Sequence, residues 1–222
     1  KVGKPNCRKD GDLDSTAPLR ISLDYNAAIN NIVTGIVKNR VLKSLSWMYV
    51  KTPRKIKEVC NDWCDYYQPH QSRNNTVVYY YDSTAIADSA DGDATPFYEI
   101  VTGILISRGW RVIQVYIGQQ MRHHKKHTYI DLALKGESAY LFPMFNKHGC
   151  EFLIQAMEQT GVKVGRNGFE KDKDIEKTPD SPENPDELKT HGTDAWDTLF
   201  IGCNFHNAPI DSSISSATSF GG

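Results

Sequence analysis

Two β-rich runs of the sequence each end in an aspartate, and these endings constrain the fold more than any other feature. Residues 19–24 alternate apolar and polar side chains, as a half-buried strand does, and end at Asp24. Residues 76–81 are apolar on both faces, as a central strand covered by helices would be, and Asp82 follows them. A carboxylate at the end of a buried strand is costly to desolvate unless a positive charge neutralises it, and a divalent cation does so most directly.

A late stretch, residues 193–202, predicts a helix that carries two more acids. Asp194 and Asp197 stand at positions i and i+3 and share one helix face, while Trp196 turns toward the core. We therefore expect these acids to converge with the two strand ends. The alternative stays open, because an aspartate after a strand is commonly a turn residue and one early in a helix commonly interacts with the helix dipole.

The remaining pattern indicates an α/β fold with a mixed central β-sheet flanked by helices. Three antiparallel strands are predicted at residues 19–24, 32–37 and 42–50. A helix that starts at Thr52-Pro53, the strand at 76–81, a helix that starts at Thr95-Pro96 and a parallel strand at 111–117 follow. Another helix is predicted at 152–160, and the charged, proline-rich residues 166–189 are predicted to form a long surface loop.

Length and composition suit one domain, because 222 residues with 39% hydrophobic content can bury a core. We expect an N-terminal arm at 1–18, the domain at 19–206 and a flexible tail at 207–222. The formal net charge of −1 excludes binding of nucleic acid through overall positive charge, so local patches must carry any such binding. The sequence contains no run apolar enough for a membrane span or a signal peptide and no P-loop, so a soluble, non-secreted protein without a nucleotide motor is expected. Cys60 and Cys64 are expected to be reduced core residues.

Such a set of acids suits hydrolysis of a phosphodiester. Two Mg²⁺ or Mn²⁺ ions about 4 Å apart activate water and stabilise the transition state, and carboxylates are the ligands they prefer. Asp24 is the candidate for bridging both ions, Asp82 for holding one, and Asp194 or Asp197 for holding the other. His191 is a candidate for contact with a metal-bound water or the leaving group, and a solvated loop histidine is the alternative.

Two basic segments are candidates for phosphate contact. Residues 122–127 contain Arg122, Lys125 and Lys126 among three histidines, and the interleaved lysines argue against a zinc site because they repel a cation. A plain solvated loop is the alternative. Lys171 and Lys173 are further candidates for DNA contact, although their alternation with acids also suits a solvated face.

Three short stretches together, residues 21–26, 80–82 and 193–199, resemble the C-terminal nuclease domain of large terminase subunits of tailed phages or prophages, within the ribonuclease H-like superfamily. The resemblance covers residues 19–205. The last motif resembles the D-x-x-D-A pattern of Holliday-junction resolvases too, but Thr198 stands where alanine is expected, which leaves open whether Asp194 or Asp197 is the principal ligand.

The resemblance implies an endonuclease that cleaves double-stranded DNA during viral genome packaging, with two Mg²⁺ or Mn²⁺ ions. It also implies an ATPase domain, a small terminase subunit and a portal as partners, and the cytoplasm of a bacterial host as the location. The alternatives are a resolvase-like or other structure-specific nuclease, and a catalytically inactive nucleic-acid-binding module on the same fold. A four-way junction is cut symmetrically by a two-fold pair of sites, so dimerisation distinguishes a resolvase.

Overall fold

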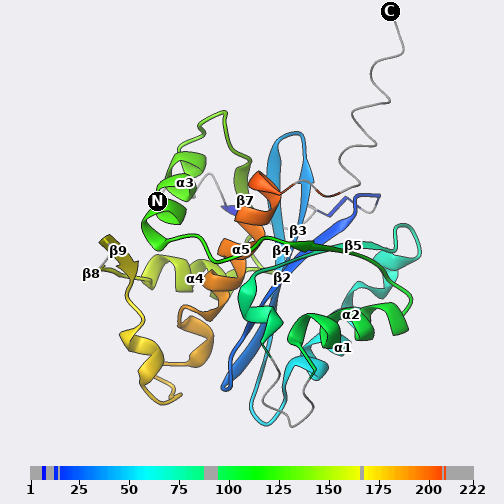
Figure 1. The fold of residues 1–222 in the computed structure, drawn as a ribbon, viewed down its shortest axis with the longest axis horizontal. Helices are drawn as coiled ribbons and strands as arrows, with labels where there is room; N and C mark the ends of the chain where they lie inside the picture. The colour runs from blue at the N-terminus through cyan, green and yellow to red at the C-terminus, as the bar shows by residue number, and fades with distance from the viewer. Residues whose placement is uncertain are drawn as a thin grey trace, which may run out of the picture.

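A mixed β-sheet forms the centre of the protein. The computed structural model describes residues 7–8, 13–14, 16–87, 95–165, 168–206 and 208. Within them the main sheet has seven strands in the order β1-β7-β4-β3-β2-β5-β6 (Figure 1). They are β1 Cys7–Arg8, β2 Leu19–Tyr25, β3 Ile29–Lys38, β4 Val41–Lys51, β5 Thr76–Tyr81, β6 Arg111–Tyr116 and β7 Phe142–Asn146.

The strand directions confirm the predicted topology. β3 is antiparallel to both β2 and β4, while β5 is parallel to β2 and to β6. β7 extends the sheet on the other side, parallel to β4 and to the short β1. Three antiparallel strands followed by parallel ones therefore make a mixed sheet, as the hydrophobic patterns predict.

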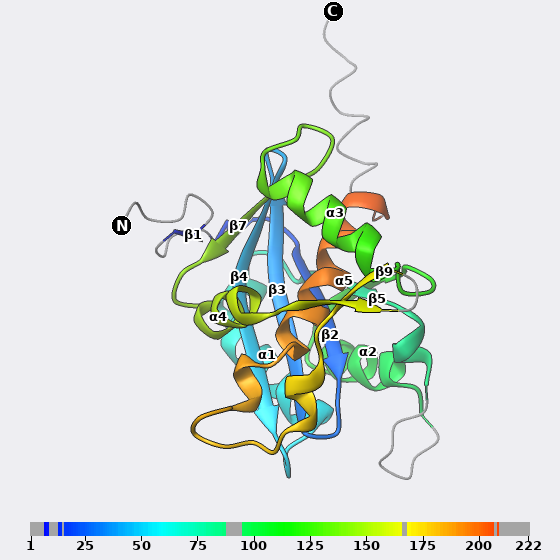
Figure 2. The same ribbon diagram turned by 90° about the vertical axis from the view of Figure 1, so that its left-hand side faces the viewer.

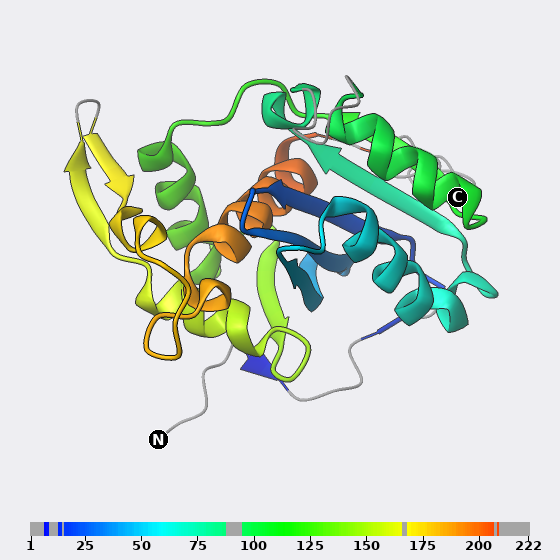
Figure 3. The same cartoon turned by 90° about the horizontal axis from the view of Figure 1, so that it is seen from below.

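Helices cover both faces of this sheet (Figures 1 and 3). α1 Ile56–Gln71 and α2 Phe97–Ser107 pack on one face, where Ile21, Trp63 and Tyr79 belong to a shared buried core. α5 His191–Phe205 packs on the other face with α3 His123–Leu134 and α4 Glu151–Gln159, around a second core that contains Trp196 and Phe200. Cys60 and Cys64 are buried in the first core, as predicted.

The start of α1 differs from the prediction. The helix begins at Ile56 and not at Pro53, because the backbone N–H of Lys55 donates to the side chain of Glu58 at 2.8 Å and closes the first turn there. Thr52 is used elsewhere, since its hydroxyl donates to the carbonyl oxygen of Ala27 at 2.8 Å. The second Thr-Pro pair does precede a helix, because α2 begins directly after Pro96.

Regular structure occurs in the predicted loop at 166–189 and in the segment at 122–127, for which a loop was the alternative. Residues 123–127 form the first turns of α3. Within 166–189, β9 Gly168–Lys171 pairs antiparallel with β8 Val162–Gly165, and the 3₁₀ turns η2 Asp174–Lys177 and η3 Asp186–Leu188 follow. A buried ion pair organises the last part, since Lys189 Nζ lies 2.5 Å from Asp186 and donates to the carbonyl oxygen of Thr178 at 2.7 Å. Charged residues thus order a segment whose composition predicts a loop.

The predicted N-terminal arm and C-terminal tail lie mostly outside the described residues. Within the part that is described, no helix combines the length and the apolar character needed to cross a membrane.

Candidate active site

The candidate site lies where two parallel strands end beneath α5. β2 and β5 are neighbours in register, with Ile21 opposite Tyr79, so Asp24 and Asp82 leave the sheet at the same edge. α5 packs closely on β2, where the hydroxyl of Ser22 donates to the carbonyl oxygen of Ala195 at 2.5 Å. This contact brings the first turns of α5, with Asp194 and Asp197, to the same face of the sheet as Asp24.

Asp24 is linked directly to the start of α5. His191 Nδ1 lies 3.3 Å from Asp24 Oδ2, and His191 is buried while Asp24 is partly exposed. Burial raises the pKa of Asp24, the charge of Asp194 raises it further, and the hydrogen bond from His191 opposes the rise. Burial alone would lower the pKa of His191, but the hydrogen bond to Asp24 and the neighbouring carboxylates outweigh it and raise that pKa. Aspartate and histidine therefore form a partly buried, charge-assisted pair.

Asp82 is engaged locally. Its Oδ1 accepts hydrogen bonds from the backbone N–H of Thr84 at 2.8 Å and from the Thr84 hydroxyl at 2.6 Å, and so caps the 3₁₀ turn η1 Ser83–Ile86. Asp82 is only 4% exposed. Asp82 therefore acts as a turn residue, which is the alternative given above for a strand-end aspartate. Both hydrogen bonds use the same carboxylate oxygen, Oδ1.

The two acids of α5 are paired with lysines. Lys171 Nζ lies 2.8 Å from Asp194 Oδ1 and 2.7 Å from Asp197 Oδ2, so it bridges both carboxylates. Lys173 pairs with the other oxygen of Asp194, and Lys126 Nζ lies 3.1 Å from Asp197 Oδ2. Burial alone would raise the pKa of Asp194, but the charges of Lys171 and Lys173 outweigh it and hold that pKa well below its usual value.

The donor type of these residues suits a hard divalent cation, but their arrangement does not. Carboxylate oxygens are the ligands of Mg²⁺ and Mn²⁺. In the described part of the chain, however, no three His, Cys, Asp or Glu side chains are grouped to hold an ion. Lysine ammonium groups supply the positive charge at Asp194 and Asp197 instead. Asp24, Asp194 and Asp197 are thus brought to one region, and Asp82 lies at the end of the strand next to that of Asp24, without these acids forming a metal centre in this conformation.

The predicted basic segment divides between surface and interior. Arg122 and Lys125 are exposed, whereas Lys126 is 6% exposed and points at Asp197. Lys126 shares a helical face with Ile130 and Ala133, at i, i+4 and i+7, and this spacing is the sequence signal that marks its inward direction. The pairing of lysines with the acids of α5 was not predicted.

A cavity of about 590 Å³ adjoins the lysines. It is bounded by α3, α4, α5, β7 and the β8–β9 hairpin, and its walls are mainly apolar, with Ile130, Met157 and Trp196 among them. Lys126, Lys171 and Asp197 also line it. The neighbouring His123, whose Nδ1 is buried without a hydrogen-bond partner, lines it too and was not predicted as a site residue. Burial and then the charge of Lys126 lower the pKa of His123.

Comparison with known proteins shows similarity of fold. No protein-family model and no curated protein matches the sequence. The nuclease domain of the P22 large terminase is similar in structure, with a TM-score of 0.53 and 12% sequence identity over 96% of this chain and 95% of that domain. The large terminase of a thermophilic bacteriophage, in complex with ADP, gives a TM-score of 0.58 and 12% identity over 91% of this chain and 43% of that protein.

A second structure of the thermophilic phage terminase, in complex with ATP-gamma-S, gives a TM-score of 0.57 and 11% identity over 89% of this chain. The chain spans only 42% of that protein, so it corresponds to less than half of a large terminase. The similarity to the P22 domain, in contrast, covers 95% of that domain. The chain has the ribonuclease H-like fold of large-terminase nuclease domains.

Proposed function

We propose that this chain is a metal-dependent endonuclease that cleaves double-stranded DNA during viral genome packaging. The observation that carries the proposal is the meeting of Asp24 and the start of α5: His191 contacts Asp24 at 3.3 Å, and Asp194 is near enough to raise the pKa of Asp24. Acids from a strand end and a helix on one face of a ribonuclease H-like sheet are the side chains that such a nuclease needs.

The proposed ligands of Mg²⁺ or Mn²⁺ are Asp24, Asp82, Asp194 and Asp197, and His191 is proposed to position Asp24. Arg122 and Lys125 are the proposed DNA contacts, because they are exposed at the start of α3, the helix whose Lys126 pairs with Asp197. Lys126, Lys171 and Lys173 are engaged with the acids in this conformation. Their proposed contact with phosphate therefore requires release from those carboxylates.

The proposal extends to an assembly. The similarity covers under half of the thermophilic phage terminase, whose structures contain ADP or ATP-gamma-S, so an ATPase domain is the proposed partner of this chain. A small terminase subunit and a portal complete the proposed machine, in the cytoplasm of an infected or prophage-bearing bacterium. Double-stranded DNA is the proposed substrate.

Plasmid digestion tests the activity. Incubation with Mg²⁺ or Mn²⁺ should linearise supercoiled plasmid, and EDTA should prevent it. Asp24→Asn should abolish cleavage without lowering the melting temperature in EDTA, since burial and the charge of Asp194 raise the pKa of Asp24 and so disfavour its ionised form in the folded protein. The matched control is Asp62→Asn, at an exposed aspartate of α1 that pairs with Arg54 on the opposite face of the sheet, and it should cut normally.

Full cleavage by the Asp24→Asn variant would show that the proposed site is not the active site. DNA binding by the parent protein without cleavage under any of these metals would instead identify an inactive binding module on this fold.

A further inference from the structure

Three lysines pair with the two acids of α5, and one of them, Lys173, also lies 3.6 Å from Glu176. Asp194 and Asp197 carry two negative charges, and Lys126, Lys171 and Lys173 bring three positive charges to them. Lys171 is the central member, because its ammonium group contacts both carboxylates and also donates to the Thr193 hydroxyl at 2.9 Å. The Lys171 side chain is 15% exposed and that of Asp197 is 5% exposed, so water screens this cluster weakly.

A divalent cation cannot share these carboxylates with the lysines. Like charges within a few ångströms repel strongly where the dielectric constant is low. A cation bound to Asp194 and Asp197 would lie where the Lys171 ammonium now lies, since that group already bridges the two side chains. Binding of metal at the α5 acids and pairing with Lys171 therefore exclude each other.

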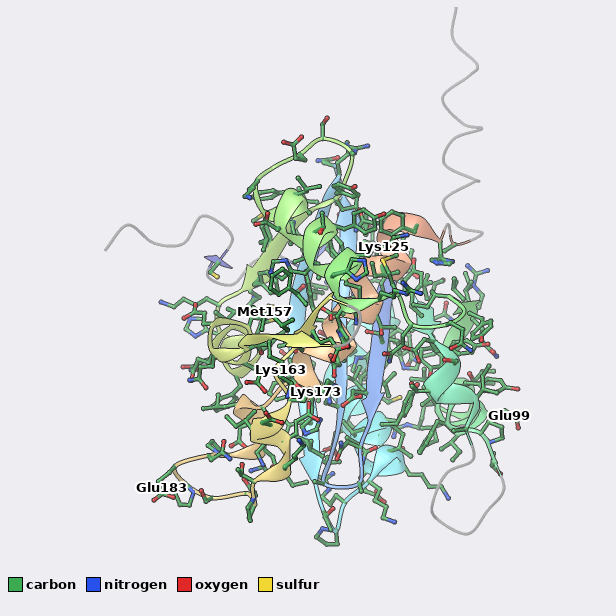
Figure 4. All side chains as sticks on the ribbon, turned by 60° about the vertical axis from the view of Figure 1, so that its left-hand side comes forward. Glu99, Lys125, Met157, Lys163, Lys173 and Glu183 are labelled. Carbon is green, nitrogen blue, oxygen red and sulfur yellow. The ribbon has the colours of Figure 1, made fainter. Side chains whose placement is uncertain are left out.

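The lysines come from an element that is suited to move. Lys171 ends β9 and Lys173 follows it, and β8 and β9 form a two-stranded sheet separate from the main one. A two-stranded hairpin is marginally stable by itself, so the position of this one depends on its contacts with α3 and α5. Figures 2 and 3 show the β8–β9 hairpin next to α3, and Figure 4 shows Lys163 and Lys173 on this side of the molecule, well away from Glu99 of α2.

The hairpin also exposes apolar side chains. Val162, Val164 and Phe169 are 55%, 81% and 61% exposed, respectively. The cavity of about 590 Å³ lies under the hairpin and includes Val162 and Phe169 in its lining. Incomplete apolar packing below the hairpin leaves the lysine–aspartate pairs as a principal attachment of β9 to α5.

We propose that Lys171 and Lys173 act as an internal counter-ion that keeps Asp194 and Asp197 free of metal until the β8–β9 hairpin is released, and that the released lysines then bind DNA phosphates. This inference rests on the proposed nuclease function and specifies how its site is loaded. DNA phosphates would bind the released lysines and metal would bind the released acids, so both ligands stabilise the released state. DNA and metal must therefore each strengthen the binding of the other by the same factor.

Titration calorimetry with MnCl₂ on the whole chain tests the competition without any cleavage assay. Lys171→Gln and Lys173→Gln should each bind Mn²⁺ more tightly than the parent, by about tenfold, within the range usual for coupled sites. Lys163→Gln is the matched control, because it removes the same charge from the same hairpin. Lys163 pairs with Asp172 at 3.3 Å and Asp174 at 2.9 Å and does not contact α5, so its variant should bind Mn²⁺ as the parent does.

Melting curves keep the test decisive if one variant folds poorly. Lys171→Gln removes the ammonium group that bridges the two carboxylates, so it should melt below the parent in EDTA and recover in MnCl₂. The Lys173 side chain is 40% exposed, so Lys173→Gln should fold normally and report on Mn²⁺ affinity by itself. Unchanged or weaker Mn²⁺ binding by Lys173→Gln, with Lys171→Gln showing no recovery in MnCl₂, would overturn the counter-ion role.

The same proteins separate this inference from the proposed function. Plasmid cleavage by the parent together with unchanged Mn²⁺ affinity in both lysine variants would overturn the counter-ion role and keep the nuclease. Tighter Mn²⁺ binding by both variants without any cleavage would support the counter-ion role and reject the nuclease.

Discussion

The packing of α5 on β5 depends on Gly202, and Gly202→Ala should measure how closely the two elements approach. A Cβ atom at Gly202 would lie 2.3 Å from Cδ1, 2.5 Å from Cγ and 2.9 Å from Cβ of Tyr80. Tyr80 is completely buried and its hydroxyl accepts a hydrogen bond from Arg20, so the ring has no free space into which it can rotate. The helix itself must shift to accommodate the methyl group.

The expected change in the free energy of unfolding of Gly202→Ala follows from two opposing effects. Alanine in a helix interior is favoured over glycine by about 1 kcal/mol. Overpacking of a filled core opposes this by about 1–3 kcal/mol, and contacts with Cγ and Cβ, which are close to the backbone, place Gly202 near the upper end. The free energy of unfolding should therefore fall by about 1–2 kcal/mol. Gly103→Ala in α2 is the matched control, because its Cβ would meet nothing within 4 Å, and it should raise the free energy of unfolding by up to about 1 kcal/mol.

Urea denaturation monitored by circular dichroism measures the free energy of unfolding of both variants. In a chain of this size each kcal/mol shifts the melting temperature by about 2–4 °C, so the two variants should melt on opposite sides of the parent. A Gly202→Ala protein as stable as the Gly103→Ala protein would refute the close approach of α5 to β5, and with it the placement of the α5 acids.

Three further outcomes are expected. The pKa of Asp194 is lower in the folded state than its ordinary value of 3.8. The contribution of Asp194 to stability is therefore present above pH 3.8 and is lost as the pH falls through the folded pKa. Acid unfolding of Asp194→Asn should depend less on pH than that of the parent. The pKa of His191 is higher in the folded state than its ordinary value of 6.5, so its contribution to stability is complete below pH 6.5 and is lost as the pH rises through the folded pKa. The free energy of unfolding in urea should therefore fall less for His191→Gln than for the parent over that rise in pH. Replacing Arg122 and Lys125 by Ala should flatten the slope of log DNA affinity against log salt by about 0.9 for each phosphate that the protein no longer neutralises, whereas Lys57→Ala, on the opposite face of the sheet, should not change the slope.

Local patterns in the sequence determined the elements of the fold. Residues 19–24 and 76–81 are strands because alternating or continuous apolar side chains suit one or two buried faces, and the i, i+3 spacing of Asp194 and Asp197 places them on one side of a helix. Such patterns depend on neighbours a few residues away. The start of α1 was misplaced because Thr-Pro signals a helix start, whereas the hydrogen bond between Lys55 and Glu58 sets it.

Only the tertiary structure decided what the acids contact. The sequence has 26 lysine and arginine residues, and nothing local distinguishes Lys126, Lys171 and Lys173 as the ones that meet α5. An ion pair requires two charged groups within about 4 Å, which depends on how α3 and the β8–β9 hairpin pack on α5. The spacing of residues along the sequence does not determine this distance in the folded protein. For this reason the sequence alone predicts a set of carboxylates, and the fold determines that lysines accompany them.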